Sequence, residues 1–269
     1  MGRYILGRVL VAFPVLIGIT IVMFLLANQM PGDVVAAMSS DTAPLPEELI
    51  ALRRGQLGLD QPVHEQYWGW ISEVLRGNLG RSFIDGRAIT DIIGERLPAT
   101  VELMGLSLLF SVLFGVTLGV ISAVKRYTTL DYVLTVGGFA GISLPVFFIA
   151  MLLIYVFSLQ LGWLPTSGRG TAGEAFSLAD RFRHLLMPML ALGLLRTAQF
   201  MRYTRASVLE VINEDYVRTA RAKGISESRV LSRHIVRAAL LPVVTVVGTT
   251  LPVLVSGAII IEQVFQWPG

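Results

Sequence analysis

Long apolar runs dominate this chain, and the polar residues gather between them. A helix that crosses a bilayer needs about 20 mostly apolar residues, with a usual range of roughly 17–25. Five runs reach that length, at Val9–Asn28, Leu103–Val124, Val133–Leu161, Leu185–Met201 and Ala238–Ile261. The pattern predicts an all-α integral membrane protein, a polytopic bundle with five transmembrane helices and a small helical outer segment after the first of them.

Composition agrees with a membrane location. Only 15% of the 269 residues are charged, whereas soluble domains carry about 25% charged residues. The chain has no cysteine, which excludes a disulfide framework, a thiolate metal site and a cysteine nucleophile. The net charge of +3 is too small to argue for nucleic acid, so we expect the lipid bilayer as a partner and no nucleic acid.

The first apolar run has two interpretations. Arg3 and Arg8 precede an apolar core, as in a secretory signal peptide. The core is longer than that of a typical signal, however, and Met30–Asp33 offers no small-x-small cleavage site. We therefore expect a retained first helix.

Basic residues in the loops predict how the bundle is oriented. Cytoplasmic loops carry an excess of Lys and Arg. Arg3 and Arg8 place the amino terminus in the cytoplasm, and Lys125-Arg126 then fall on the same side. The segment 202–237 also falls on the cytoplasmic side, and it carries eight cations at positions 202, 205, 218, 221, 223, 229, 233 and 237. The segment 31–99 is then the outer, periplasmic one.

The sequence of that outer segment predicts three short helices. One begins at Pro46-Glu47-Glu48, with proline and acids in the first turn. A second has Asp60 as its N-cap and runs to about Leu75, and a third covers Ile89–Leu97. Tyr67, Trp68 and Trp70 in the second helix favour an aromatic belt at the lipid interface or packing onto the bundle over a ligand site.

Small residues in the runs predict close helix contacts. Gly115 and Gly119 form a G-x-x-x-G pair, as do Gly137 and Gly141. This spacing lets helix backbones approach closely in lipid. Pro145, Pro188, Pro242 and Pro252 lie in or near the runs and predict kinks.

No pattern for catalysis or cofactor binding is present. The sequence lacks the G-x-x-x-x-G-K-[ST] phosphate loop and the H-E-x-x-H zinc motif, and its three histidines lie far apart. Carboxylates are missing from the middle of the runs, because Glu102, Asp131 and Glu262 fall near run ends. Their absence there weakens a proton-coupled carrier without eliminating it. Arg196 is the one deep cation, and it either snorkels toward the interface or faces a water-filled path.

The basic segment 202–237 contains a well-delimited helix over 213–224. Asn213 is a suitable N-cap, Glu214 and Asp215 follow at the positive end, and Gly224 suits the left-handed position that ends a helix. Such a helix buries little in its own chain, so docking into another protein's groove is one interpretation. The other is a solvated basic surface helix.

The sequence of this helix carries a family likeness. The segment Asp215-Tyr216-Val217-Arg218-Thr219-Ala220-Arg221-Ala222-Lys223-Gly224 resembles the coupling loop of dipeptide/oligopeptide-type ABC importer permeases. Further similar stretches follow the family order from Pro31-Gly32-Asp33 through Leu57-Gly58-Leu59-Asp60, Gly77-Asn78-Leu79-Gly80 and Arg96-Leu97-Pro98 to Glu262-Gln263-Val264-Phe265 and Trp267-Pro268-Gly269. The large outer segment resembles that of the "B" subunit of the permease pair.

The resemblance implies one ABC importer transmembrane domain over 1–269, in the bacterial inner membrane. It implies a non-catalytic permease subunit that forms the path for short peptides or similar small solutes. The expected partners are a homologous second permease, two ATP-binding subunits and an external solute-binding protein, with ATP bound by the partners and no cofactor on this chain. The alternative function is a stand-alone secondary carrier or channel. A membrane-embedded enzyme is the least supported of the three functions.

The resemblance also assigns residues. The ATPase-coupling residues are Asp215, Tyr216, Arg218, Thr219, Ala220, Arg221, Ala222, Lys223 and Gly224, in a cytoplasmic coupling region over 202–237. Arg196 is a possible path-lining residue and departs from the family, which has a small or polar residue there. The family has six spans, so we expect the sixth to be missing and the chain to be a truncated product.

Overall fold

The computed structural model describes residues 2–29, 47–56, 58–82 and 85–269. Over these ranges the regular structure is helical, apart from an isolated antiparallel bridge between Arg81 and Ala88. The chain divides into two compact units, Met1–Gly94 and Glu95–Gly269, which are described separately. The expectations for Pro31–Asp33, Pro46 and Leu57 lie outside the described residues.

The first unit holds three helices and the start of a fourth: α1 (Gly2–Gln29), α2 (Glu47–Gln56), α3 (Val63–Leu75) and the first turns of α4 (Ile89–Val124). The aromatic rings of α3 pack on α1, because the ring centroids of Tyr67 and Trp70 lie 5.5 and 5.7 Å from that of Phe24. The Tyr67 hydroxyl also lies 2.9 Å from that of Thr20. Trp68, in contrast, is 68% exposed. Tyr67 and Trp70 therefore pack onto α1, whereas Trp68 remains available for the lipid interface.

Two helix boundaries in this unit differ from the sequence prediction. Pro62, not Asp60, is the N-cap of α3, and the Asp60 carboxylate instead lies 3.6 Å from the Arg54 guanidinium. The expected third outer helix is not separate, because α4 runs without a break from Ile89 through Pro98 to Val124. Pro98 removes a single backbone hydrogen bond, and a helix of this length retains its other backbone bonds.

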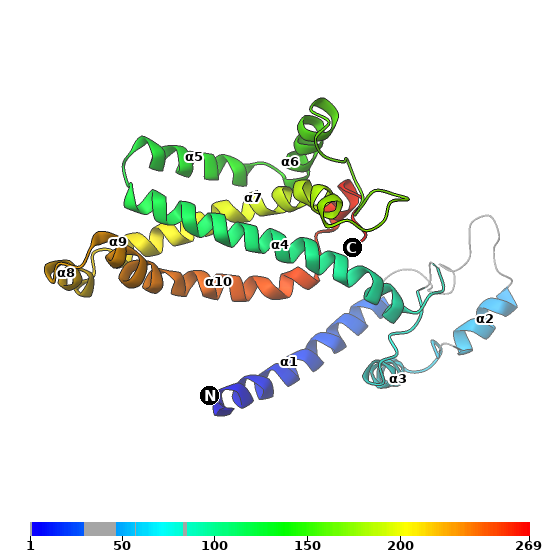
Figure 1. The fold of residues 1–269 in the computed structure, drawn as a ribbon. Helices are drawn as coiled ribbons and strands as arrows, with labels where there is room; N and C mark the ends of the chain where they lie inside the picture. Colours follow the sequence, from blue (N-terminus) through cyan, green and yellow to red (C-terminus); the bar gives the residue numbers. More distant parts are fainter. Residues whose placement is uncertain (1, 30–46, 57, 83–84) are drawn as a thin grey trace. The chain divides into compact units, whose positions relative to one another are not determined.

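The second unit consists of the rest of α4 and the helices that follow it (Figure 1). Their bounds are α5 (Thr129–Ser143), α6 (Val146–Leu153), the π-helix η2 (Ile154–Gln160), α7 (Leu178–Val211), α8 (Asp215–Ala222), α9 (Glu227–Arg229), the π-helix η3 (Val230–Val236), α10 (Arg237–Val255) and α11 (Ile259–Val264). In Figure 1, α4, α5, α7 and α10 run alongside one another, with α8 and α9 at one end and α6 and α11 at the other. The expected coupling region 202–237 thus includes the last turns of α7 as well as α8, α9 and η3.

Three described helical stretches are long and apolar enough to cross a membrane: Gly2–Gln29, Ile89–Val124 and Glu227–Leu254. The expected third span, Val133–Leu161, is broken by a bend of 103° between Thr129–Ser143 and Val146–Gln160, and it makes a fourth only if the bent pair is one span. Leu144-Pro145 stands at the bend, where proline removes a hydrogen-bond donor. α7, which holds the expected span Leu185–Met201, is not among these candidates. The count of five spans is therefore not confirmed.

A row of small residues brings α4 against α7. The row recurs every four residues and is buried along its length: Ser107, Ser111, Gly115, Gly119 and Ala123. A Cβ atom on Gly115 would lie 2.5 Å from the Cβ of Phe200, and one on Gly119 would lie 2.6 Å from the Cβ of Thr204. The close approach predicted for Gly115 and Gly119 is confirmed.

The second glycine pair behaves differently. Added Cβ atoms on Gly137 and Gly141 would meet no atom within 4 Å. The prediction that this pair makes a close helix contact is therefore wrong for the described part of the chain. Because the i and i+4 positions of any helix share a face, the spacing shows which residues are aligned but not whether a neighbouring helix lies there.

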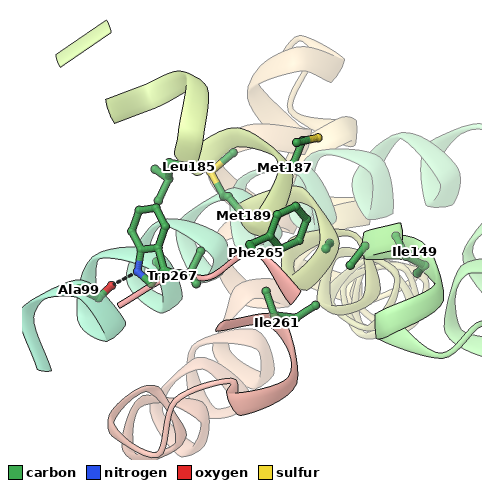
Figure 2. Close-up of a cluster of buried hydrophobic side chains, with 11 residues drawn as sticks. Ala99, Ile149, Leu185, Met187, Met189, Ile261, Phe265 and Trp267 are labelled. Carbon is green, nitrogen blue, oxygen red and sulfur yellow. Dashed lines mark hydrogen bonds between the residues drawn. The ribbon is translucent and has the colours of Figure 1, made fainter. Parts of the chain in front are cut away.

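Buried apolar side chains form three clusters in the second unit. One lies at the α6 and α11 end (Figure 2) and comprises Ala99, Leu103, Ile149, Ala150, Leu185, Met187, Met189, Ala191, Ile261, Phe265 and Trp267. A second, at the α8 end, comprises Ala123, Val208, Val217, Ala220, Val230, Ile235 and Ala239. A third joins Leu108, Phe200 and Val243. In the first cluster, the indole N–H of Trp267 donates a 2.8 Å hydrogen bond to the Ala99 carbonyl.

Candidate coupling surface and transport path

α8 is a short helix whose ends are both well defined. It begins at Asp215 with Glu214 in the N-cap position. The Asn213 expected there instead points its amide back to the Leu209 carbonyl, at 3.4 Å. Asn213 therefore belongs to the turn after α7, one residue too early for a cap.

At its other end α8 stops at Gly224 in a left-handed conformation, as the sequence predicted. Its φ is +75°, a backbone conformation that glycine adopts without strain. The Gly224 N–H donates to the Arg221 carbonyl at 2.9 Å, and the Ile225 N–H donates to the Ala220 carbonyl at 3.3 Å. This pair of bonds is a Schellman motif, which satisfies two carbonyls that the helix end would leave free.

One face of α8 is buried within this chain, contrary to the sequence prediction. Val217 is fully buried and Ala220 is 5% exposed. They belong to the cluster that also holds Ala123 of α4, Val208 of α7 and Ala239 of α10. Val217 and Ala220 lie three residues apart and so share a helix face. Ala220 is therefore part of the chain's own core.

The opposite face of α8 is exposed. It presents the remaining residues of the expected set: Asp215, Tyr216, Arg218, Thr219, Arg221, Ala222, Lys223 and Gly224. The Arg221 guanidinium bonds both carboxylate oxygens of Glu227, at 2.7 and 3.1 Å. These bonds raise the pKa of Arg221 above its ordinary value and link α8 to α9.

An ion pair fixes the neighbouring ends of α5 and α7. Asp131 is 3% exposed and accepts two hydrogen bonds of 2.9 Å from the Arg205 guanidinium. It also accepts the Ser122 hydroxyl and, at 3.0 Å, the Tyr127 N–H. The sequence placed Asp131 near a span end but gave no partner for it, because Arg205 lies 74 residues away.

Arg196 lies on α7 and is partly exposed. Among the described residues, no hydrogen-bond or ionic partner of its guanidinium is found within bonding distance. Gln199 and Tyr203 follow it at intervals of three and four residues, and both are exposed. Because this spacing puts the three side chains on one face of the helix, they form a polar stripe along α7.

A second ionic cluster lies at the opposite end of the second unit. The Glu102 carboxylate accepts two 2.8 Å hydrogen bonds from Arg181 and further bonds from Arg169. Both guanidinium carbons lie 5.8 Å from the Trp267 ring centroid. The sequence gave no sign of this cluster, because its residues come from three distant segments. No group of three or more His, Cys, Asp or Glu that suits a metal ion occurs among the described residues, and the absence of a cofactor stays a prediction.

Comparison with known proteins gives the family. Residues 115–269 match the family described as binding-protein-dependent transport system inner membrane component, and residues 1–104 match its N-terminal region. The chain belongs to this family. It is a permease of the ABC importer class and a multi-pass membrane protein, and family members are transport subunits rather than enzymes.

Several curated relatives are similar over the whole chain. A putative peptide permease protein of Brucella suis is 43% identical over 270 residues, which covers 100% of this chain and 85% of the relative. The oligopeptide transport system permease protein AppB of Bacillus subtilis is 38% identical with the same coverage. The glutathione transport system permease protein GsiC of Escherichia coli is 40% identical, over 100% of this chain and 84% of the relative.

Proposed function

We propose that this permease, with a homologous second permease subunit, forms the path of an ATP-driven importer for short peptides or similar small solutes. Two ATP-binding subunits act on its cytoplasmic side, and an external solute-binding protein delivers the cargo. The functions in the names of the relatives, peptide and glutathione transport, support this cargo class. The amino terminus is cytoplasmic, as the basic residues of α1 and of the α8 region favour.

In this proposal α7 also crosses the membrane, which brings the four candidate spans to five. It contacts α5, α6 and α10, and the row of small residues on α4 packs against it. A helix surrounded by other helices needs less apolar surface than one surrounded by lipid, and polar residues in a membrane usually face the interior of a bundle. The central position of α7 accounts for its more polar sequence.

The observation that carries the coupling proposal is the buried face of α8. Through Val217 and Ala220, α8 shares one apolar cluster with the ends of α4, α7 and α10. Protein interiors are close-packed, so a displacement of α8 is passed to these helices and not absorbed. The exposed face of α8 is left for the ATPase subunit, with the small Ala222 giving close access.

A substitution on the exposed face tests this role. Ala222→Leu adds bulk at an exposed position and leaves Val217 and Ala220 in place. We expect the variant to insert and fold normally but to lose substrate-stimulated ATP hydrolysis and uptake together, since the ATPase no longer seats on α8. Ala220→Glu is less useful, because it also buries a carboxylate in the chain's own core.

Ser228→Leu is the matched control, because it places the same side chain at an exposed position of α9. It should keep both activities. If Ala222→Leu retains wild-type uptake and substrate-stimulated ATP hydrolysis, α8 is not the coupling element.

A stand-alone secondary carrier is the alternative function. The observation that favours a solute path of either kind is Arg196 on the polar stripe of α7, which meets no partner in the described part of the chain. Copurification distinguishes the two. An importer subunit isolated gently from its native membrane carries ATP-binding subunits in stoichiometric amount. A carrier that transports solute after purification without such subunits would refute the importer proposal.

A further inference from the structure

A groove runs between α5 and α7 near the end at which α8 lies. It encloses about 180 Å³, and its lining is apolar apart from Thr135, Arg202 and Arg205. The apolar wall includes Phe139, which is 53% exposed, and Ile142. The groove is therefore open along one side, and apolar side chains are available to whatever lies in it.

The charges beside this groove are unbalanced. Arg205 is neutralised by Asp131, but Arg202 meets no carboxylate in the described residues and lies 5.7 Å from the Tyr203 ring centroid. Lys125 and Arg126, also without an ionic partner among those residues, belong to the turn before α5.

That turn is held next to Arg205. The backbone N–H of Tyr127 bonds the same Asp131 carboxylate that pairs with Arg205. The unbalanced cations therefore gather at the Asp131 end of the groove. Its apolar wall continues away from them, toward Ile142 on α5 and Ala198 on α7.

We propose that this groove binds one anionic phospholipid of the cytoplasmic leaflet. The phosphate lies at Arg202, within the field of Lys125 and Arg126, and an acyl chain lies along Phe139 and Ile142. The assignment rests on the cytoplasmic orientation of this end in the proposed function. Basic pockets between helices on this side of a membrane suit anionic headgroups. A free phosphate ion would use the cations but not the apolar wall.

Lipid retention by the purified complex tests the proposal. The permease is purified with its partner subunits after reconstitution into phosphatidylcholine vesicles that contain phosphatidylglycerol. Bound lipid is counted by native mass spectrometry. We expect one phosphatidylglycerol to be retained in preference to phosphatidylcholine, and Arg202→Gln to weaken that retention about fivefold, the effect of one basic residue near an anionic surface.

Two further variants separate the parts of the site. Ala206→Phe fills the groove without changing charge and should also reduce retention. Arg229→Gln removes an exposed cation of α9 that does not line the groove, and should leave retention unchanged. Equal retention of both lipids, or no loss in Arg202→Gln, would overturn the proposal.

Two other occupants of the groove would give different experimental results. Displacement of the lipid signal by millimolar inorganic phosphate would indicate an anion site and refute the lipid. Cross-linking of Ala206→Cys to the second permease would show that a protein covers the groove, and this result would refute the lipid as well. Since retention is measured without transport, a complex that couples ATP hydrolysis to uptake but retains no lipid refutes this site and leaves the proposed function standing.

Discussion

Adding one methyl group to Gly119 should separate α4 from α7. A Cβ atom there would lie 2.6 Å from the Thr204 Cβ and 2.7 Å from the Met201 carbonyl oxygen. Neither is the flexible end of a side chain, so the helices themselves must move apart. Overpacking of this kind costs about 1–3 kcal/mol. The separation also stretches the 2.9 Å bond from the Ser111 hydroxyl to the Gly193 carbonyl, worth about 0.6 kcal/mol in a membrane bundle.

Gly105→Ala is the matched control, because it makes the same change in the same helix at a position with no atom within 4 Å. Both variants gain the helix propensity of alanine over glycine, about 1 kcal/mol, so their difference isolates the packing. We expect Gly119→Ala to be less stable than Gly105→Ala by about 1.6–3.6 kcal/mol, with the two costs taken together. Equilibrium unfolding in mixed micelles measures this difference. Equal stability of the two variants would refute the close contact between α4 and α7.

Three other substitutions have defined outcomes. Gly224→Val places a β-branched residue at a φ of +75° and should loosen the end of α8, so that ATP hydrolysis continues while uptake falls. Uptake at the wild-type rate would contradict this. Arg196→Ser removes the partly exposed cation of α7 and should weaken competition by free peptides more than by peptides with an amidated carboxyl end, whereas an unchanged competition profile would indicate a snorkelling arginine. Trp267→Phe removes the indole hydrogen bond to Ala99 and should lower the free energy of unfolding by about 1 kcal/mol, and no change in micelle unfolding would show that this bond is dispensable.

Local backbone chemistry was predictable from the sequence. Gly224 was expected to end α8 in a left-handed conformation, and it does. The start of α8 was misplaced by one residue, because Asn213 and Glu214 lie side by side and the N-cap geometry, not residue type, decides between them. Signals of this kind depend on a few neighbouring residues, which a single sequence contains.

Which face of a helix is covered was harder to predict. Gly115 and Gly137 both start G-x-x-x-G pairs, yet only the pair at Gly115 meets another helix in the described chain. Ala220 belongs to a helix that was expected to bury little in its own chain, although this residue is 5% exposed. In both cases the outcome depends on where a segment distant in sequence lies.

Ionic partners were missed for the same reason. Asp131 and Glu102 were each placed near a span end, but their partners Arg205 and Arg181 lie 74 and 79 residues further along the chain. No local pattern links residues at that separation. An i, i+4 pair, in contrast, is visible directly in a sequence.

The anchored α8 also bears on how the ATPase subunit of the proposed importer would associate. A segment that folds only on binding must lose its conformational freedom at that moment, at about 1–2 kcal/mol for each residue fixed. Val217 and Ala220 hold α8 in the chain's own core, and Gly224 closes its end, so the helix is already formed before any partner arrives. If the ATPase subunit docks on α8 as proposed, it meets a rigid surface, and assembly of the complex needs less interface area than a disordered loop of the same sequence would require.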